Sequence, residues 1–232
     1  MTMITQLNPT RRALLSGTAG GAVLLLLPGC ASTGGVFSME EAVRRLLLLA
    51  SENAFARLTA PGGFWDEQVA RIGLEQFLGA RGNTLSRILT SSLFKDRLEE
   101  RFAEFAIDAS FRAAPVVTDA VRVIGFANAL ELVRGGPSAA SSFLRAEIGT
   151  ALVDAVVPEL GEAIRLAQDP LVGQALAALT GVDVGGVATR IGREVDDAVW
   201  GEIAREEAAI RANPQATRDP LLIGVFGLGS RV

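Results

Sequence analysis

Apolar residues recur every three to four positions along most of the chain, which is the spacing of one face of an α-helix. Between positions 184 and 212 they form an unbroken series: Val187, Ile191, Val195, Val199, Ile203 and Ile210. A second clear series consists of Leu98, Phe102, Phe105, Ala106 and Ala109. No stretch alternates polar and apolar residues for long enough to predict a strand. The sequence therefore predicts an all-α protein, folded as a single multi-helix bundle.

Residues that begin or break helices divide this pattern into segments. Ser38 and Glu41 have the spacing of a capping box, so the first helix is expected to run from there to about Leu58. The turn residues Pro61-Gly62-Gly63 separate it from the second. Pro115 is expected to end or kink its helix, and Pro158 is expected to start a new segment. The expected helices after the first are about 64–78, 85–93, one before Pro115, 118–134, 137–157, one from Pro158, and 184–212. An apolar tail from 221 to 227 is expected to dock on the bundle.

The N-terminal region has the order of parts of a bacterial export signal. Two arginines, Arg11 and Arg12, precede an apolar run from Ala13 to Leu27, and the only cysteine, Cys30, follows. The run has about 15 residues and contains glycines, whereas a helix that spans a bilayer needs about 20 apolar residues. The pattern therefore predicts a signal peptide over residues 1–29.

Two short motifs in this region resemble known processing sites. The stretch 10–15, around Arg11-Arg12, resembles the signal of the twin-arginine exporter, although arginine pairs also occur in signals of the general secretory route. Residues 27–30 resemble a lipobox, which implies cleavage before Cys30 and attachment of lipid to its thiol. Residues 30–37 would then be a lipidated tether and residues 38–232 the all-α domain. Ala31 and Ser32 after the cysteine resemble an outer-membrane sorting signal more than an inner-membrane one, so we expect a periplasmic protein on the outer membrane.

The composition excludes several kinds of chemistry. The chain has no histidine and one cysteine, so a Ser-His-Asp or Cys-His mechanism and a zinc site of Cys and His ligands are not available. The sequence contains no Asp-x-Asp-x-Asp-Gly loop, the pattern that would indicate a calcium site. The net charge is −4, and removal of Arg11 and Arg12 would make it more negative, which argues against nucleic-acid binding. We expect no cofactor, no metal and no nucleic-acid partner.

Charged residues near the C-terminus offer a candidate site with two interpretations. Glu207 and Arg211 are four residues apart on the last long helix, the spacing of an ion pair. Arg218 follows the Asn213-Pro214 stop and could reach back to Glu206 or Glu207. In the structural interpretation Arg211 and Arg218 hold the apolar tail on the bundle; in the functional one they form a small anion-binding pocket. The structural interpretation is the commoner situation for such residues.

Three pairs of adjacent carboxylates could in principle serve acid–base chemistry, namely Glu99-Glu100, Asp196-Asp197 and Glu206-Glu207. Neighbours on a helix point about 100° apart, so they do not face each other across a substrate. We expect these side chains to be solvated on the surface. Phe64-Trp65 follows a glycine turn, where it could contact lipid or a peptide, but we favour a place in the core. Trp200 is expected in the core with a partner for its indole N–H. Glycines within the helical segments indicate close helix approach or, less commonly, a groove for an apolar ligand: Gly125, Gly149, Gly161, Gly173, Gly185, Gly186 and Gly192.

Several stretches together resemble a bacterial family catalogued as domain of unknown function number 4197. They are residues 105–115, 127–136 and 137–144, and a C-terminal signature over 206–214, 217–218 and 221–227. Asn128 stands where the family has Asp, and Ser141 where it has Thr. The resemblance covers about 39–227 and implies a helical protein that is secreted or lipid-anchored. It carries over no catalytic residue.

These observations favour a membrane-anchored periplasmic lipoprotein without enzymatic activity, which acts as a binding or scaffold protein. Its partner would be the membrane, through Cys30, and a further protein or an apolar small molecule. The alternative is a carboxylate-dependent hydrolase that acts on cell-envelope glycans. A pocket with two carboxylates about 5 to 10 Å apart would favour that alternative.

Overall fold

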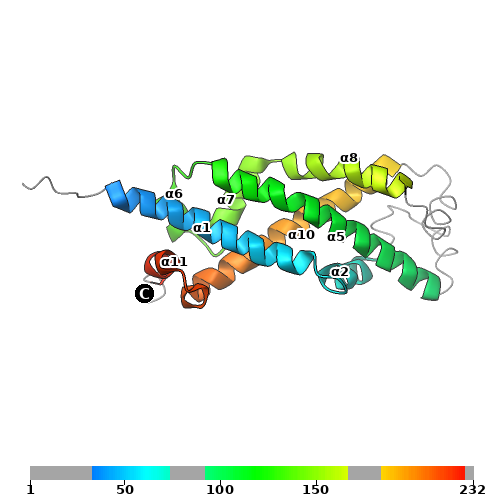
Figure 1. Ribbon diagram of the computed structural model, residues 1–232, viewed down its shortest axis with the longest axis horizontal. Coiled ribbons are helices and arrows are strands. Elements are labelled where there is room, and N and C mark those ends of the chain that lie inside the picture. The colour runs from blue at the N-terminus through cyan, green and yellow to red at the C-terminus, as the bar shows by residue number, and fades with distance from the viewer. Residues whose placement is uncertain (1–32, 74–91, 167–183, 228–232) are drawn as a thin grey trace, which may run out of the picture. The chain divides into compact units, whose positions relative to one another are not determined.

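The computed structural model describes residues 33–73, 92–166 and 184–227, and these residues form helices without any strand (Figure 1). The all-α prediction is confirmed. Arg11, Arg12 and Cys30 lie outside the described residues, as does most of the predicted helix 85–93. The elements are α1 (Thr33–Leu58), α2 (Phe64–Ile72), α5 (Ser92–Val123), α6 (Ala129–Arg134), α7 (Ala139–Ile148), α8 (Ala151–Leu166), α10 (Val184–Ala212), the 3-10 helix η1 (Pro214–Thr217) and α11 (Pro220–Phe226).

The four longest of these helices, α1, α5, α8 and α10, pack around one core. Helix α1 contacts α5 and α10, and α8 contacts the same two helices from the other side (Figure 1). The short helices lie against this set: α2 on α5, α7 on α10, and α6 and α11 on α1. This is the multi-helix bundle that the apolar periodicity predicts.

Helix α10 follows its sequence pattern closely. All six of its predicted inward residues are buried: Val187, Ile191, Val195, Val199, Ile203 and Ile210. The helix has the predicted bounds, and Pro214 begins η1 directly after it. Trp200 is also buried, and its Nε1 donates to Asp196 Oδ1 at 3.0 Å, which confirms both expectations for this residue.

Helix α1 begins earlier than the sequence predicts. It starts at Thr33, so Ser38 lies inside the helix and the predicted capping box is wrong. Glu41 instead accepts a hydrogen bond at 2.8 Å from Arg45, one helical turn further on. The end at Leu58, the break at 61–63 and the start of α2 at Phe64 agree with the prediction. None of the described helices is both long enough and apolar enough to cross a bilayer.

Proline does not break the helices where the sequence suggests. Helix α5 continues through Pro115, and α8 continues through Pro158. Both prolines are exposed, and so is Phe111, whose carbonyl loses its intrahelical donor at Pro115 and can be hydrated instead. On the opposite face Ala113 and Val117 are fully buried, and their packing holds α5 together across the proline.

The two predicted helices that follow are each divided. The segment 118–134 is interrupted after Val123, and the turn places the ring of Phe126 in the core, with the Arg44 guanidinium 5.3 Å from its centroid. The segment 137–157 is interrupted at Gly149, whose φ of 59° glycine adopts at little cost. Helix α2 ends at Ile72, not near 78, because Gly73 has a φ of 83°.

The aromatic pair that follows the Gly62-Gly63 turn belongs to the core. Trp65 is fully buried, and its Nε1 donates to Ser110 Oγ at 3.0 Å. Phe64 packs edge-on against it with ring centroids 5.2 Å apart. The core interpretation of this pair is confirmed. Glycine serves close approach at Gly192, where a Cβ atom would lie 2.6 Å from a methyl group of Val157 on α8.

Candidate functional site

The last turns of α10 carry the adjacent carboxylates Glu206 and Glu207, which have opposite surroundings. Glu207 is fully buried, whereas the side chain of Glu206 is 16% exposed and lines a surface groove. The prediction that the adjacent carboxylates are solvated surface groups is therefore wrong for Glu207 and for Asp196, which are buried, and for Glu99, whose side chain is only 12% exposed. Two neighbouring residues thus belong to two different features of the molecule.

The Glu207 carboxylate caps the N-terminus of α7. The backbone N–H of Ala140 donates to Oε1 at 3.0 Å, and that of Ser141 donates to Oε2 at 2.7 Å. The first N–H groups of a helix have no intrahelical acceptor, and the helix dipole favours a negative charge beside them. Glu207 from α10 therefore supplies what a side chain at the N-cap would otherwise supply, and the N-cap residue Ser138 makes no such bond.

Arg211 connects this carboxylate to the end of α6. Its Nε donates to Glu207 Oε1 at 2.8 Å, while Nη1 and Nη2 donate to the carbonyl oxygens of Val133 and Leu132 at 3.0 and 2.8 Å. Carbonyl groups in the last turn of a helix lack intrahelical donors and lie at the negative end of its dipole. One guanidinium group thus joins a carboxylate and a helix C-terminus in a single plane.

The same guanidinium also contacts α11. Its Cζ lies 4.8 Å from the ring centroid of Phe226, a distance at which a cation is attracted to an aromatic face. Phe226 and Leu222 are the buried residues of α11. We call Glu207, Arg211 and Phe226 the C-terminal clasp, because together they join α6, α7 and α11 to α10.

Arg218 does not join the clasp. Its side chain is exposed and makes no ion pair with Glu206 or Glu207, so the expectation that it reaches back to them is wrong. Its φ of 56° is left-handed, and its N–H donates to Gln215 O, which closes η1.

The second attachment of α11 comes from Asp219, which the sequence interpretation did not consider. Its Oδ1 accepts from the N–H groups of Leu221 and Leu222, and its Oδ2 accepts from Arg45 on α1 at 3.0 Å. Burial opposes ionisation of Asp219, but these hydrogen bonds outweigh it and lower its pKa. An Asp followed by Pro at the first helical position is a helix-start signal that could have identified this residue.

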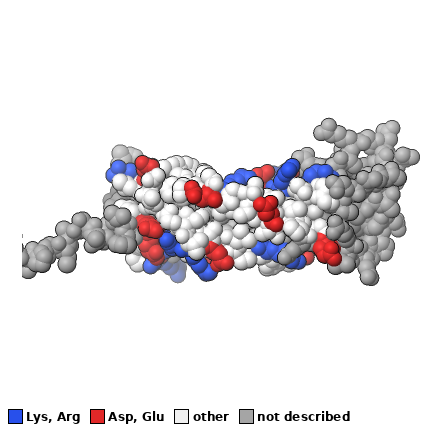
Figure 2. All heavy atoms as spheres, turned by 90° about the horizontal axis from the view of Figure 1, so that it is seen from above, with Lys and Arg blue, Asp and Glu red and all other residues white. Residues whose placement is uncertain are grey.

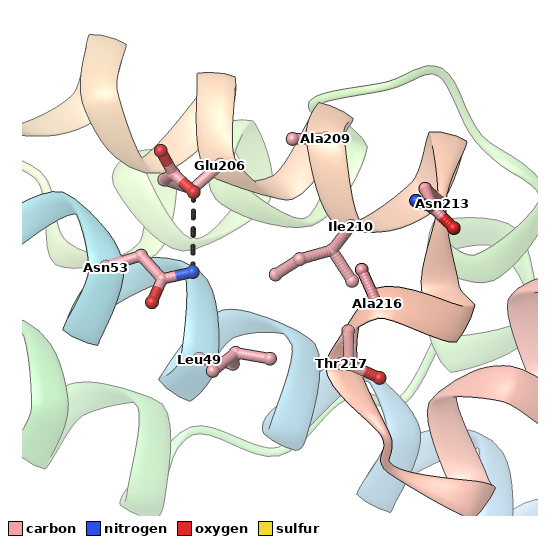
Figure 3. Close-up of a pocket in the computed structure, with 8 residues that line it drawn as sticks. All are labelled: Leu49, Asn53, Glu206, Ala209, Ile210, Asn213, Ala216 and Thr217. Carbon is pink, nitrogen blue, oxygen red and sulfur yellow. Dashed lines mark hydrogen bonds between the residues drawn. The ribbon is translucent and has the colours of Figure 1, made fainter.

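Apart from the C-terminal clasp, α10 also lines a groove of about 330 Å³, which lies between α1 and η1 (Figure 3). Its apolar part consists of Leu49, Ala209, Ile210 and Ala216, and its polar part of Asn53, Glu206, Asn213 and Thr217. Asn53 Nδ2 donates to Glu206 Oε2 at 3.3 Å, and Arg205 donates to Glu206 Oε1 at 2.8 Å. Glu206 is the one carboxylate that lines the groove.

The model of the family described as "Protein of unknown function (DUF4197)" matches residues 35–227. This chain belongs to that family. No curated protein matches the chain, and no solved structure matches it. The DUF4197 match includes both the C-terminal clasp and the groove.

A further ionic cluster in this DUF4197 chain joins α7 to α10. Arg145 Nη2 donates to Asp196 Oδ2 at 2.7 Å and to Asp197 Oδ1 at 2.5 Å. Burial raises the pKa of Asp196, and the opposing effects of Arg145 and Trp200 are smaller. Asp197 is exposed, so one arginine from α7 bonds one buried and one solvated carboxylate. Arg145 and Asp196 are 51 residues apart in the chain, so local spacing could not predict this contact.

Charge on the described surface of the DUF4197 chain is mixed. On the face drawn in Figure 2, acidic and basic side chains alternate and neither sign gathers into a large patch. Many acids pair with a base one turn away, as Glu40 does with Arg44 at 3.0 Å and Asp119 with Arg122 at 3.2 Å. Among the described residues, no three potential ligands come together as a metal site would need. Within the described ranges, the groove between α1, α10 and η1 offers space for a ligand.

Proposed function

We propose that this DUF4197 protein is a non-enzymatic binding protein of the cell envelope, held on the periplasmic side of a membrane by lipid on Cys30. It binds its partner in the groove between α1, α10 and η1. The observation that supports binding is the lining of this groove, which combines four apolar residues with four polar ones. Ligand sites in proteins combine apolar lining with polar groups that orient the ligand, and their volumes begin at about 300 Å³.

The same lining argues against a carboxylate-dependent hydrolase. Glycosidases use two carboxyl groups about 5 to 9.5 Å apart on either side of the scissile bond. Among the groove residues Glu206 is the one carboxylate, and Arg205 and Asn53 already bond its oxygens. The neighbouring Glu207 is enclosed in the clasp, where its oxygens accept from two backbone N–H groups. Binding is therefore the better account of this groove.

Native mass spectrometry of the full-length protein from its own membrane tests the binding proposal. Ala209 is exposed on the floor of the groove, so Ala209→Trp should fill the groove without changing the core. We expect a bound mass on the wild-type protein that is at least tenfold less abundant on Ala209→Trp. The matched control is Ala155→Trp, an exposed helical alanine on α8 outside the groove, which should keep the bound mass. An equal bound mass on both tryptophan variants, or none on the wild type, would contradict the proposal.

The anchor is tested separately, by fractionation of Cys30→Ser. Without the thiol no lipid can be attached, so the variant should leave the membrane fraction or accumulate as unprocessed precursor. Labelling with a radioactive or clickable fatty acid should mark the wild type and not the variant. A variant that stays in the membrane fraction with its signal removed would show that Cys30 is not the anchor.

A further inference from the structure

We infer that the groove binds an extended polypeptide segment, held through its backbone by the carboxamides of Asn53 and Asn213 and through a basic side chain by Glu206. This inference rests on the proposed function, because it names the kind of partner that the binding groove accepts. Three features of the groove support it: available carboxamides, their spacing, and the charge at one end.

The two asparagine side chains have unused hydrogen-bonding groups. Asn213 occupies the N-cap of η1, where asparagine normally bonds a backbone N–H, yet its side chain makes no such bond. Asn53 is exposed, and its Nδ2 contacts Glu206 at 3.3 Å while its Oδ1 accepts no hydrogen bond from the described residues. A carboxamide has donors and an acceptor side by side, which matches the N–H and C=O of a peptide unit.

The spacing of the polar groups fits an extended chain. Asn213 follows the last residue of α10 and lies seven residues after Glu206, and its N–H still donates to Ala209 O. Seven residues correspond to about 10 Å along a helix. An extended peptide covers this distance in about three residues of roughly 3.3 Å each. Figure 3 shows Asn53 and Glu206 at one end, Asn213 at the other, and Ile210 between them. Since side chains of an extended chain alternate in direction, one between the two ends would point to the Leu49 and Ile210 floor.

The charge of the groove favours a basic or neutral segment over an anionic ligand. A carboxylate offers about four lone-pair positions, and the hydrogen bonds from Arg205 and Asn53 occupy two of those of Glu206. A lysine or arginine of the partner can use the others. The basic groups nearby are engaged as well: Arg205 bonds Glu202 and Glu206, and Arg57 lies 3.4 Å from Glu202. A phosphate or an acidic headgroup would find no unpaired cation in the lining.

Two other ligand classes fit the lining less well. None of the eight lining residues is aromatic, so the groove offers no flat ring on which a sugar face could pack. Its apolar part consists of two large and two small side chains, which is too short a surface for an acyl chain. An extended peptide needs what the groove has: amide partners at intervals and space for one apolar side chain.

Fluorescence polarisation with the full-length protein in detergent tests this inference. The probe is a labelled pool of acetylated, amidated heptapeptides that have Lys near one end, Leu at the centre and mixed residues elsewhere. Three control pools change one property each: Glu replaces Lys, Ser replaces Leu, or the central backbone amides are N-methylated. We expect the Lys pool to bind at least tenfold more tightly than the Glu pool and the N-methylated pool. Asn53→Ala and Asn213→Ala should each weaken binding about 3- to 10-fold, the range for loss of a hydrogen bond.

The outcomes separate the inference from the proposed function. Equal affinity of the normal and N-methylated pools, or equal binding to wild type and Ala209→Trp, would overturn backbone recognition in the groove. If no pool binds while the wild type still carries a mass that Ala209→Trp loses, the ligand class is wrong and the binding function remains. If neither peptide nor groove-dependent mass is found, both are wrong.

Discussion

Replacement of Glu207 by glutamine should lower the free energy of unfolding by about 3 kcal/mol or more, the scale for breaking a buried ion pair. Both carboxylate oxygens accept a backbone N–H at the start of α7, at 3.0 and 2.7 Å. An amide can accept only one of them, and its NH₂ group would then face a second donor. The change also removes the counter-charge of Arg211, whose side chain is only 10% exposed. Urea unfolding followed by tryptophan fluorescence measures the loss.

Glu206→Gln is the matched control for this prediction. The substitution is the same and lies one residue away, but Glu206 faces the groove and not the clasp. We expect a change of about 0 to 1 kcal/mol, as for a pair at the surface. Equal effects of the two substitutions on the free energy of unfolding would show that the buried position of Glu207 does not stabilise the protein as described.

Replacement of Arg211 by methionine should have an effect of similar size, about 3 to 5 kcal/mol, because it leaves the Glu207 charge buried without its partner. Methionine has a comparable length and a good helix propensity, so the loss would not come from α10 itself. The change also removes the donors to Leu132 and Val133 and the cation above Phe226. Amide hydrogen exchange should therefore become faster in α6 and α11 than in α2, which is remote from the clasp.

Arg211→Lys separates charge from geometry. Lysine keeps the positive charge, but an ammonium group cannot present the planar set of donors that meets Glu207 and two carbonyl groups together. We expect the free energy of unfolding of Arg211→Lys to lie between that of the wild type and that of Arg211→Met. A lysine variant as stable as the wild type would show that charge alone is needed at this position.

The bundle could be predicted from the sequence because its long helices have a regular apolar face. Helix α10 is the clearest case: its bounds, its inward residues and the burial of Trp200 all follow from the series that starts at Val187. The breaks were harder to predict. Pro115 predicts a helix end or a kink from local stereochemistry, but its exposed position and the burial of Val117 on the opposite face keep α5 continuous. Tertiary packing therefore decided whether a helix continued where the local sequence signals were ambiguous.

The candidate site shows the same limit. The spacing of Glu207 and Arg211 predicts their ion pair, and the pair is present at 2.8 Å. The sequence could not show that the pair also serves the ends of α6 and α7, because those partners lie 66 to 79 residues away in the chain. Nor could it place Arg218 outside the clasp, since the local spacing does not predict the left-handed backbone at this residue. The groove likewise depends on how α1 and η1 meet α10.

The central claim is that Glu207 and Arg211 act as one structural unit, and a double-mutant cycle tests it most directly. The unfolding free energies of the wild type, Glu207→Gln, Arg211→Met and the double variant give the coupling between the two side chains. We predict a coupling of about 1.5 to 3 kcal/mol, since the second substitution removes a group that the first has already left unpaired. Effects that add within about 0.5 kcal/mol would contradict the account, because residues that act independently show that additivity.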